Sequence, residues 1–184
     1  MKSRHGAEPR LGDWYLTFTG RQFWPMDPRP EDIDIRDIAH HLSLICRFNG
    51  ACRRFYSVAQ HSCIVSDNLP QPLRREGLLH DAPETYYGDV VRPLKYSLPE
   101  YLRAERLGAQ AVALRFGVPA VTSREVKVAD NRALMTERRD LMAVTPHPWL
   151  VTEAQFPPFP EKIIPWSPVK AEAEFITRFF ELMP

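Results

Sequence analysis

Four side chains that could bind a metal are spread along the chain: His61, His80, Asp81 and Asp130. His80 and Asp81 follow the apolar run "GLL", and Asp130 lies among apolar residues in "VKVADNRAL". An imidazole or carboxylate in such a setting needs a cation or several donors, because burying it unpaired costs free energy. Two imidazoles and two carboxylates offer one divalent ion a mixed nitrogen and oxygen shell, which suits Mn, Fe, Co, Ni or Zn, with Mg also compatible. We therefore expect one divalent transition metal at these residues.

Each of these residues taken alone has a simpler interpretation. A single histidine is more often a core or surface residue, and Asp130 could pair with Arg132 or Arg138. The pattern gains force as a set in which every member lies on a predicted helix. Four other histidines lack such a setting: His5, His40, His41 and His147. The adjacent pair shares a helix with its apolar stripe, so we expect a structural role for it.

Apolar spacing indicates about six helices and little strand. The predicted helices cover residues 35–46, 58–69, 72–81, 99–116, 122–144 and 168–183. Three positions match signals for a helix start: Asp34 as an N-cap, and two capping boxes, Ser57 with Gln60 and Thr122 with Glu125. The last helix is expected to bury Val169, Ala173, Ile176 and Phe180. The aromatic stretch 14–24 predicts a short strand or hairpin around Gly20.

These elements predict an all-α fold. We expect one domain over residues 1–184, with a core of about 30–145 and a C-terminal helix at 168–183. The short connection between helices 58–69 and 72–81 makes them antiparallel neighbours. That arrangement would bring His61 near His80 and Asp81.

Composition and charge limit the class of protein. The chain has 184 residues and a net charge of +1, so it has no broad electrostatic footprint for nucleic acid or an anionic membrane. No run approaches the roughly 20 apolar residues of a membrane span, and the first residues show no secretory signal. Cys46, Cys52 and Cys63 lack CxxC spacing, which favours a reduced cytoplasmic setting. Amphipathic helices and many aromatic residues lead us to expect a homo-oligomer.

Three segments carry the four residues: "VAQHS", "LLHDAPE" and "VADNRAL". In this order they resemble the signature segments of the HD-domain phosphohydrolase superfamily, over about residues 30–145. The match is close to the compact nucleotide-hydrolysing branch, which includes bacterial 5′-deoxynucleotidases and bacteriophage dATP triphosphohydrolases. The segment 20–48 is also similar to that of small HD hydrolases of phages and bacteria. The resemblance implies an HD-type helical bundle, a metal bound by the four residues, and hydrolysis of phosphate esters or anhydrides in the cytoplasm of a bacterium or phage-infected cell.

The resemblance also implies roles for further residues. In the related nucleotidases, acids at offsets similar to those of Glu84 and Asp89 position or activate the attacking water, although these two could instead be a first-turn helix acid and a turn residue. Arg47 lies near the position of an arginine that precedes a tryptophan in those enzymes. Phe48 replaces that tryptophan and could stack on a base, and Lys95 is a second phosphate candidate. Weaker candidates are three loop arginines and two aromatic residues that could instead be core: Arg53, Arg54, Arg92, Phe23 and Trp24.

We expect a metal-dependent nucleotide phosphohydrolase whose partner is a small-molecule nucleotide, with no stable binding of nucleic acid or membrane. The preferred function is a dNTP triphosphohydrolase that takes a dATP-like substrate and releases deoxynucleoside and triphosphate. A 5′-deoxynucleotidase acting on dNMPs is the close alternative. Two other classes stay open: a non-catalytic HD-fold nucleotide sensor, and a cyclic-nucleotide or RNA phosphodiesterase, which often carries additional metal-binding histidines.

Overall fold

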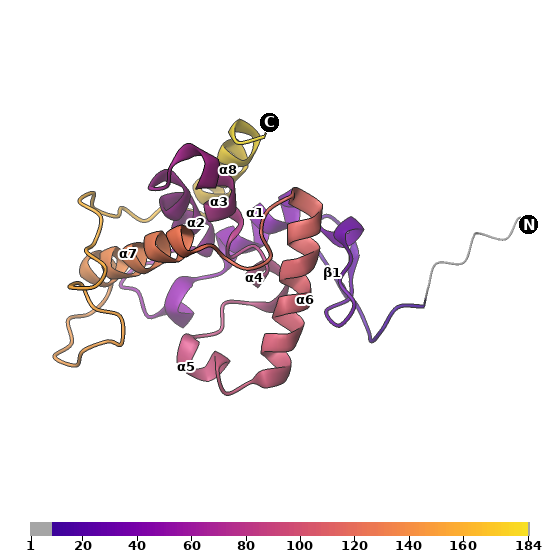
Figure 1. Cartoon of the computed structure of the whole chain (residues 1–184), viewed down its shortest axis with the longest axis horizontal. Helices are drawn as coiled ribbons and strands as arrows, with labels where there is room; N and C mark the ends of the chain where they lie inside the picture. Colours follow the sequence, from indigo (N-terminus) through magenta and orange to yellow (C-terminus); the bar gives the residue numbers. More distant parts are fainter. Residues whose placement is uncertain (1–8, 184) are drawn as a thin grey trace, which may run out of the picture.

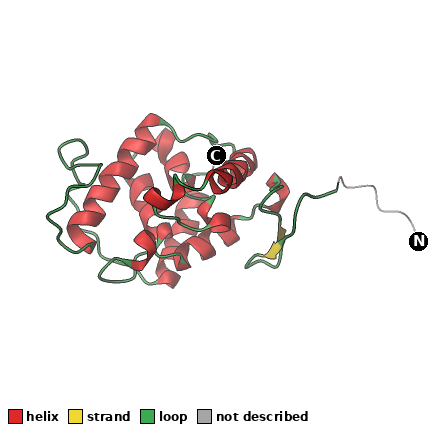
Figure 2. Cartoon of the chain, turned by 90° about the horizontal axis from the view of Figure 1, so that it is seen from below, coloured by secondary structure: helices red, strands yellow, loops and turns green. Residues whose placement is uncertain are grey.

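The computed structural model describes residues 9–183, and His5 lies outside them. Within that range the chain is mainly helical, as expected, with one two-stranded antiparallel sheet (Figures 1 and 2). Six of its eight α-helices have nine or more residues. The elements are β1 (Tyr15–Leu16), β2 (Gln22–Phe23), α1 (Ile35–Leu44), α2 (Val58–Asp67), α3 (Gln71–Leu79), α4 (Glu84–Tyr87), α5 (Arg92–Lys95), α6 (Pro99–Phe116), α7 (Arg124–Leu141) and α8 (Pro168–Glu181). None of these helices is long and apolar enough to cross a membrane.

Helix α2 lies at the centre of the fold. It contacts α1, α3, α7 and α8, and His61 and Val65 in its interior have no exposed surface (Figure 1). A helix enclosed on all sides must be largely apolar or have its polar groups paired internally. Residues 68–70 alone connect α2 to α3, and the two helices pack against each other as the short connection predicted. The main core joins α1, α2, α3, α8 and the hairpin.

The predicted helix starts are confirmed in part. Asp34 caps α1 by accepting a hydrogen bond from the backbone N–H of Arg36, and Ser57 caps α2 in the same way. The prediction of Thr122 as the cap of α7 is wrong, because Ser123 accepts from the backbone of Val126 instead. The backbone N–H of Ser123 donates to Glu76 of α3 at 2.6 Å, and this tertiary contact sets where α7 begins.

The buried face of α8 also differs from the prediction. The structure buries Ala171, Phe175 and Phe179 in the main core, whereas Val169 and Phe180 are 80% and 61% exposed. Both sets of residues are apolar and recur at helical spacing, so periodicity alone does not distinguish them. The contacts of α8 with α1 and α2 select the face that carries Phe175 and Phe179.

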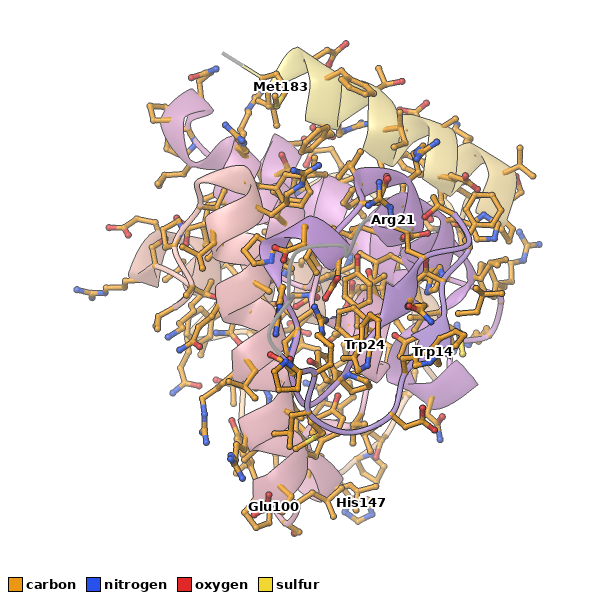
Figure 3. All side chains as sticks on the ribbon, turned by 90° about the vertical axis from the view of Figure 1, so that its right-hand side faces the viewer. Trp14, Arg21, Trp24, Glu100, His147 and Met183 are labelled. Carbon is orange, nitrogen blue, oxygen red and sulfur yellow. The ribbon has the colours of Figure 1, made fainter. Side chains whose placement is uncertain are left out.

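The N-terminal hairpin packs against α4. Phe23 is fully buried and stacks on Tyr86 with ring centroids 4.1 Å apart, and Tyr15 donates a hydrogen bond to the carbonyl of Tyr86. Trp24 lies under the guanidinium of Arg10 and beside the ring of Trp14 (Figure 3). Core packing therefore accounts for Phe23, and neither aromatic residue contacts the metal candidates.

Gln60 has a tertiary role that the capping-box interpretation missed. Its side chain donates to the carbonyl of Ile164 and accepts from the backbone N–H of Trp166, both at 2.8 Å. A buried amide side chain of α2 thus holds the segment that leads into α8. The second half of the expected capping box does not form, because the amide is bound to this segment.

We predict that Gln60→Leu destabilises the protein by about 1–3 kcal/mol, since each of two lost hydrogen bonds contributes about 0.5–1.5 kcal/mol. Urea unfolding measures the change in the free energy of unfolding. Gln71→Leu, an exposed position at the start of α3, is the matched control and should change stability by less than about 0.5 kcal/mol. Equal stability of the two variants would contradict the role assigned to Gln60.

Candidate functional site

Two buried histidines, His61 and His80, point their Nε2 atoms toward the same carboxylates. The Nδ1 atom of His61, in the middle of α2, lies 2.6 Å from Oε1 of Glu137. The Nδ1 atom of His80, just after α3, lies 2.7 Å from the carbonyl oxygen of Gly77. Each Nδ1–H therefore donates, which turns Nε2 of each ring toward the cluster. Burial and Arg47 lower the pKa of His61, but Glu137 and Asp130 raise it to about 9, so its Nε2 carries a proton unless a metal ion replaces that proton. Both Nε2 atoms are buried and have no hydrogen-bond partner among residues 9–183.

Two carboxylates face these nitrogens. Asp130 of α7 places Oδ1 3.2 Å from Nε2 of His61, and Asp81 places Oδ2 3.5 Å from the same atom and 3.3 Å from Nε2 of His80. Ligand atoms from His61, His80 and Asp130 all lie within 4.8 Å of one another. Lone pairs of oxygen and nitrogen at such distances repel unless a proton or cation lies between them. These residues could therefore hold a metal ion, as their types suggested.

Three elements bring the four predicted ligands together. His61 comes from α2, His80 and Asp81 from the end of α3, and Asp130 from α7. These helices pack against one another in the upper left of Figure 1. Burial would raise the pKa of Asp81, but His80, His61 and Arg47 hold that pKa well below its ordinary value. The carboxylate of Asp81 is therefore ionised and able to bind a cation.

Glu137 is a residue of this cluster that sequence reasoning missed. It has no exposed surface, and it accepts from Arg47 Nη2 at 3.1 Å as well as from His61. Burial favours the neutral acid, yet the charges of Arg47 and His61 lower the pKa of Glu137, so it stays ionised. Glu137 follows Asp130 by seven residues, which is two helical turns on one face. That spacing was the signal that could have found it.

Arg47 lies against the cluster, in the irregular turn Arg47–Gly50. Its Nη1 atom is 3.7 Å from Oδ2 of Asp81, and its side chain is 11% exposed. Phe48 follows with a positive φ of 55°, and its ring lies 5.1 Å from the Arg47 guanidinium carbon and 6.2 Å from the ring of Trp149. A positive φ is uncommon for an aromatic residue. This turn places the guanidinium of Arg47 beside Asp81 and the ring of Phe48 against that guanidinium.

Glu84 begins α4, close to the same cluster. The residue is 7% exposed, and its Oε2 atom is buried without a hydrogen-bond partner in the described part of the chain. Burial, together with the negative charges of Asp81 and Asp89, raises the pKa of Glu84 well above its ordinary value. Burial and Asp81 likewise raise the pKa of Asp89, while Arg47 opposes this. Glu84 can therefore exchange a proton at a higher pH than an ordinary glutamate.

Lys95 lies at the end of α5 and forms an ion pair with Glu105 of α6. Burial would lower the pKa of Lys95, but this carboxylate raises it, with a contribution from Glu84. Lys95 thus lies close enough to the cluster for Glu84 and Asp81 to act on its charge, and it is paired with Glu105. Three weaker candidates are exposed and form no ion pair with the cluster: Arg53, Arg54 and Arg92.

The adjacent histidines serve the scaffold, as expected. His40 Nδ1 lies 3.0 Å from Glu172 of α8, and its ring stacks on Phe18. His41 Nδ1 lies 3.1 Å from the carbonyl of Thr85 in α4, while its Nε2 accepts from the backbone N–H of Phe18. Three of the four ring nitrogens of this pair therefore have a protein partner. Among the described residues, the group that could hold a metal ion contains His61, His80 and Asp130 and neither of these two histidines.

No protein-family model matches the chain. The chain is 42% identical over 166 residues to the uncharacterized protein YfdR of Escherichia coli strain K12, across 90% of this chain and 93% of YfdR. It is 36% identical over 142 residues to an uncharacterized protein of Rhodobacter capsulatus, across 70% of this chain and 72% of that protein. Identity at this level over most of both chains reflects common descent. The chain therefore belongs to the protein family that includes YfdR.

Proposed function

We propose that this protein is an HD-type, metal-dependent nucleotide phosphohydrolase. The observation that supports it best is the convergence of two buried Nε2 atoms, from His61 and His80, on the carboxylates of Asp81 and Asp130. These four residues occur in the order and in the segments of the HD superfamily that the sequence resembles. An arginine and a buried acid beside them supply the remaining groups that phosphate hydrolysis needs.

The residues present fit a single divalent ion. Both histidines have their Nδ1–H engaged by protein acceptors, so a metal ion that displaces the proton on Nε2 would bind through that atom. When bound, the ion would lower the pKa of water and polarise a phosphoryl oxygen. Mixed nitrogen and oxygen ligands suit Mn, Fe, Co, Ni or Zn, and selectivity among them follows availability.

The chain's own groups would carry the proton transfer and the charge. Glu84, with its raised pKa and unpaired oxygen, accepts the proton of the attacking water. Asp89, whose pKa is also raised, lies beyond it as a second carrier of that proton. The Nη1 and Nε protons of Arg47 face developing charge on the phosphoryl oxygens, and Lys95 adds a second positive charge. Water attacks the α-phosphorus, the bond from phosphorus to the 5′ oxygen breaks, and that oxygen takes up the proton received by Glu84 or Asp89. The products are the deoxynucleoside and triphosphate.

The proposed substrate is a deoxynucleoside triphosphate such as dATP, on the strength of the resemblance, with Phe48 and Trp149 as rings on which a base can stack. One observation favours the monophosphate as a second candidate. Arg47 and Lys95 are each already paired with a carboxylate, so little positive charge is left for the β- and γ-phosphates. In both cases the products include the deoxynucleoside.

We predict that His80→Ala abolishes stoichiometric metal binding, because it removes one of the two imidazole ligands. Metal content after loading with Mn²⁺ or Co²⁺ and desalting, measured by elemental analysis, should fall from one ion per chain to none. His147→Ala, at an exposed position outside the cluster, is the control and should keep the wild-type content. Full metal content in the His80 variant would exclude this residue as a ligand.

We predict that Glu84→Gln keeps the metal and lowers kcat by about 10²–10⁴-fold, the usual contribution of a general base. Steady-state release of deoxynucleoside and parallel elemental analysis measure the two effects separately. Glu100→Gln, on the exposed surface of α6 with a side chain 81% exposed, is the matched control and should have wild-type activity. If Glu84→Gln turned over normally, the proton acceptor would have to be another residue.

We predict that the purified protein releases deoxynucleoside and triphosphate from dATP in the presence of at least one of Mn²⁺, Co²⁺, Mg²⁺ and Zn²⁺. Chromatography identifies the products from dATP and from dAMP under the same conditions. Inorganic phosphate from dAMP, with dATP untouched, would establish the second candidate. If neither nucleotide were cleaved with any metal but both bound, the protein would be a nucleotide sensor.

A further inference from the structure

Glu137 joins two residues that the proposed function assigns to different tasks. Its Oε1 lies 2.6 Å from Nδ1 of His61, a metal-ligand candidate, and its Oε2 lies 3.1 Å from Nη2 of Arg47, the phosphate candidate. The carboxylate has no exposed surface, and each oxygen therefore has one protein donor and no access to bulk water. Asp81 also pairs with Arg47 and with both histidines, but it is itself a metal-ligand candidate, whereas Glu137 is not.

We propose that Glu137 is a positioning residue that couples metal binding to phosphate binding. By accepting from Nδ1 it keeps the Nε2 lone pair of His61 directed at Asp130, and by accepting from Nη2 it holds the Arg47 guanidinium beside Asp81. The inference rests on the proposed function and extends it, because it assigns a residue that touches neither the metal nor the substrate.

The chemistry of the two partners requires a carboxylate at this place. The Nδ1–H of His61 and the Nη2–H of Arg47 are both donors, and only an ionised acid offers two acceptor oxygens and no proton. A glutamine of the same shape would turn its NH₂ group toward one of the two donors. If that group faced His61, the imidazole would take the other tautomer, with a proton on Nε2 that excludes a metal.

The guanidinium geometry explains how the coupling reaches the substrate. Arg47 uses Nη2 for Glu137, whereas Nη1 lies 3.7 Å from Asp81, too far for a hydrogen bond, and Nε is buried without a partner in the described part of the chain. Glu137 therefore anchors one edge of the guanidinium and leaves the remaining N–H groups for phosphate oxygens. Loss of the anchor would release a long, flexible side chain and weaken substrate binding.

The test compares the metal-loaded wild type with Glu137→Gln. We expect the variant to bind Co²⁺ about 10–100-fold more weakly in competition with a chelator, the usual effect of removing the partner of a metal-binding histidine. At saturating metal its KM for the deoxynucleotide should rise about tenfold or more. The matched control is Asp140→Asn, on the same helix. The carboxylate of Asp140 accepts from Arg139 and from the backbone N–H of Ile163, not from the cluster. This variant should leave both Co²⁺ affinity and KM unchanged.

A double-mutant cycle separates the two effects. In an Arg47→Met background, Glu137→Gln should still weaken Co²⁺ binding, because His61 loses its partner, but it should no longer raise KM, because the arginine is absent. A purely structural role would weaken Co²⁺ binding and raise KM to the same extent in either background. Glu137→Asp keeps the charge but is one methylene shorter. It should partly impair either Co²⁺ binding or KM, but not both.

The outcomes distinguish the inference from the proposed function. A wild type that binds no divalent metal would overturn the proposed function, and the inference with it. Wild-type Co²⁺ affinity and KM in folded Glu137→Gln would overturn the inference alone. If the variants failed to fold, nitrogen NMR of His61 in the Zn²⁺-loaded wild type decides: a proton retained on Nδ1 supports the coupling, and an unprotonated Nδ1 refutes it.

Discussion

The burial of charged and titratable groups at the centre of a helical protein is the constraint on which the rest of the structure depends. His61 and Glu137 have no exposed surface, and the Arg47 side chain is only 11% exposed. Such groups are stable inside a protein only if each donor meets an acceptor, since an unpaired buried charge is strongly destabilising. The packing of α2 against α3 and α7 brings many of these partners together. The Nε2 atoms of His61 and His80 then face the carboxylates of Asp81 and Asp130.

The distribution of charge gives this place its chemistry. Five carboxylates act on one arginine and one lysine among the described residues of the cluster: Asp81, Glu84, Asp89, Asp130 and Glu137. Burial, and then the negative charges of Asp81 and Asp89, raise the pKa of Glu84. The excess of negative charge also favours a bound cation, because the interior screens charge less than water does.

The N-terminal segment has a part in positioning the site. Helix α4 has four residues, too few to be stable alone, and yet it carries Glu84. Tyr15 and His41 bind the carbonyls of Tyr86 and Thr85, and Phe23 stacks on the ring of Tyr86. These contacts hold the backbone of α4 at a defined place relative to α2. The hairpin and α1 therefore fix the position of the helix that carries the proposed proton acceptor.

The sequence by itself determined the helical class, the bounds of the six longer helices to within about three residues and the four residues that converge, because apolar spacing, capping residues and a short connection between helices are local signals. It did not determine which apolar face of α8 is buried, which of two neighbouring residues caps α7, or that Gln60 binds the segment before α8. Those outcomes depend on partners far along the chain. The contacts of Glu137 were also decided by tertiary structure. The helical spacing places Glu137 two turns from Asp130 on the same face of α7. Its two hydrogen-bond donors, His61 and Arg47, come from α2 and from the turn at Arg47, which pack against α7.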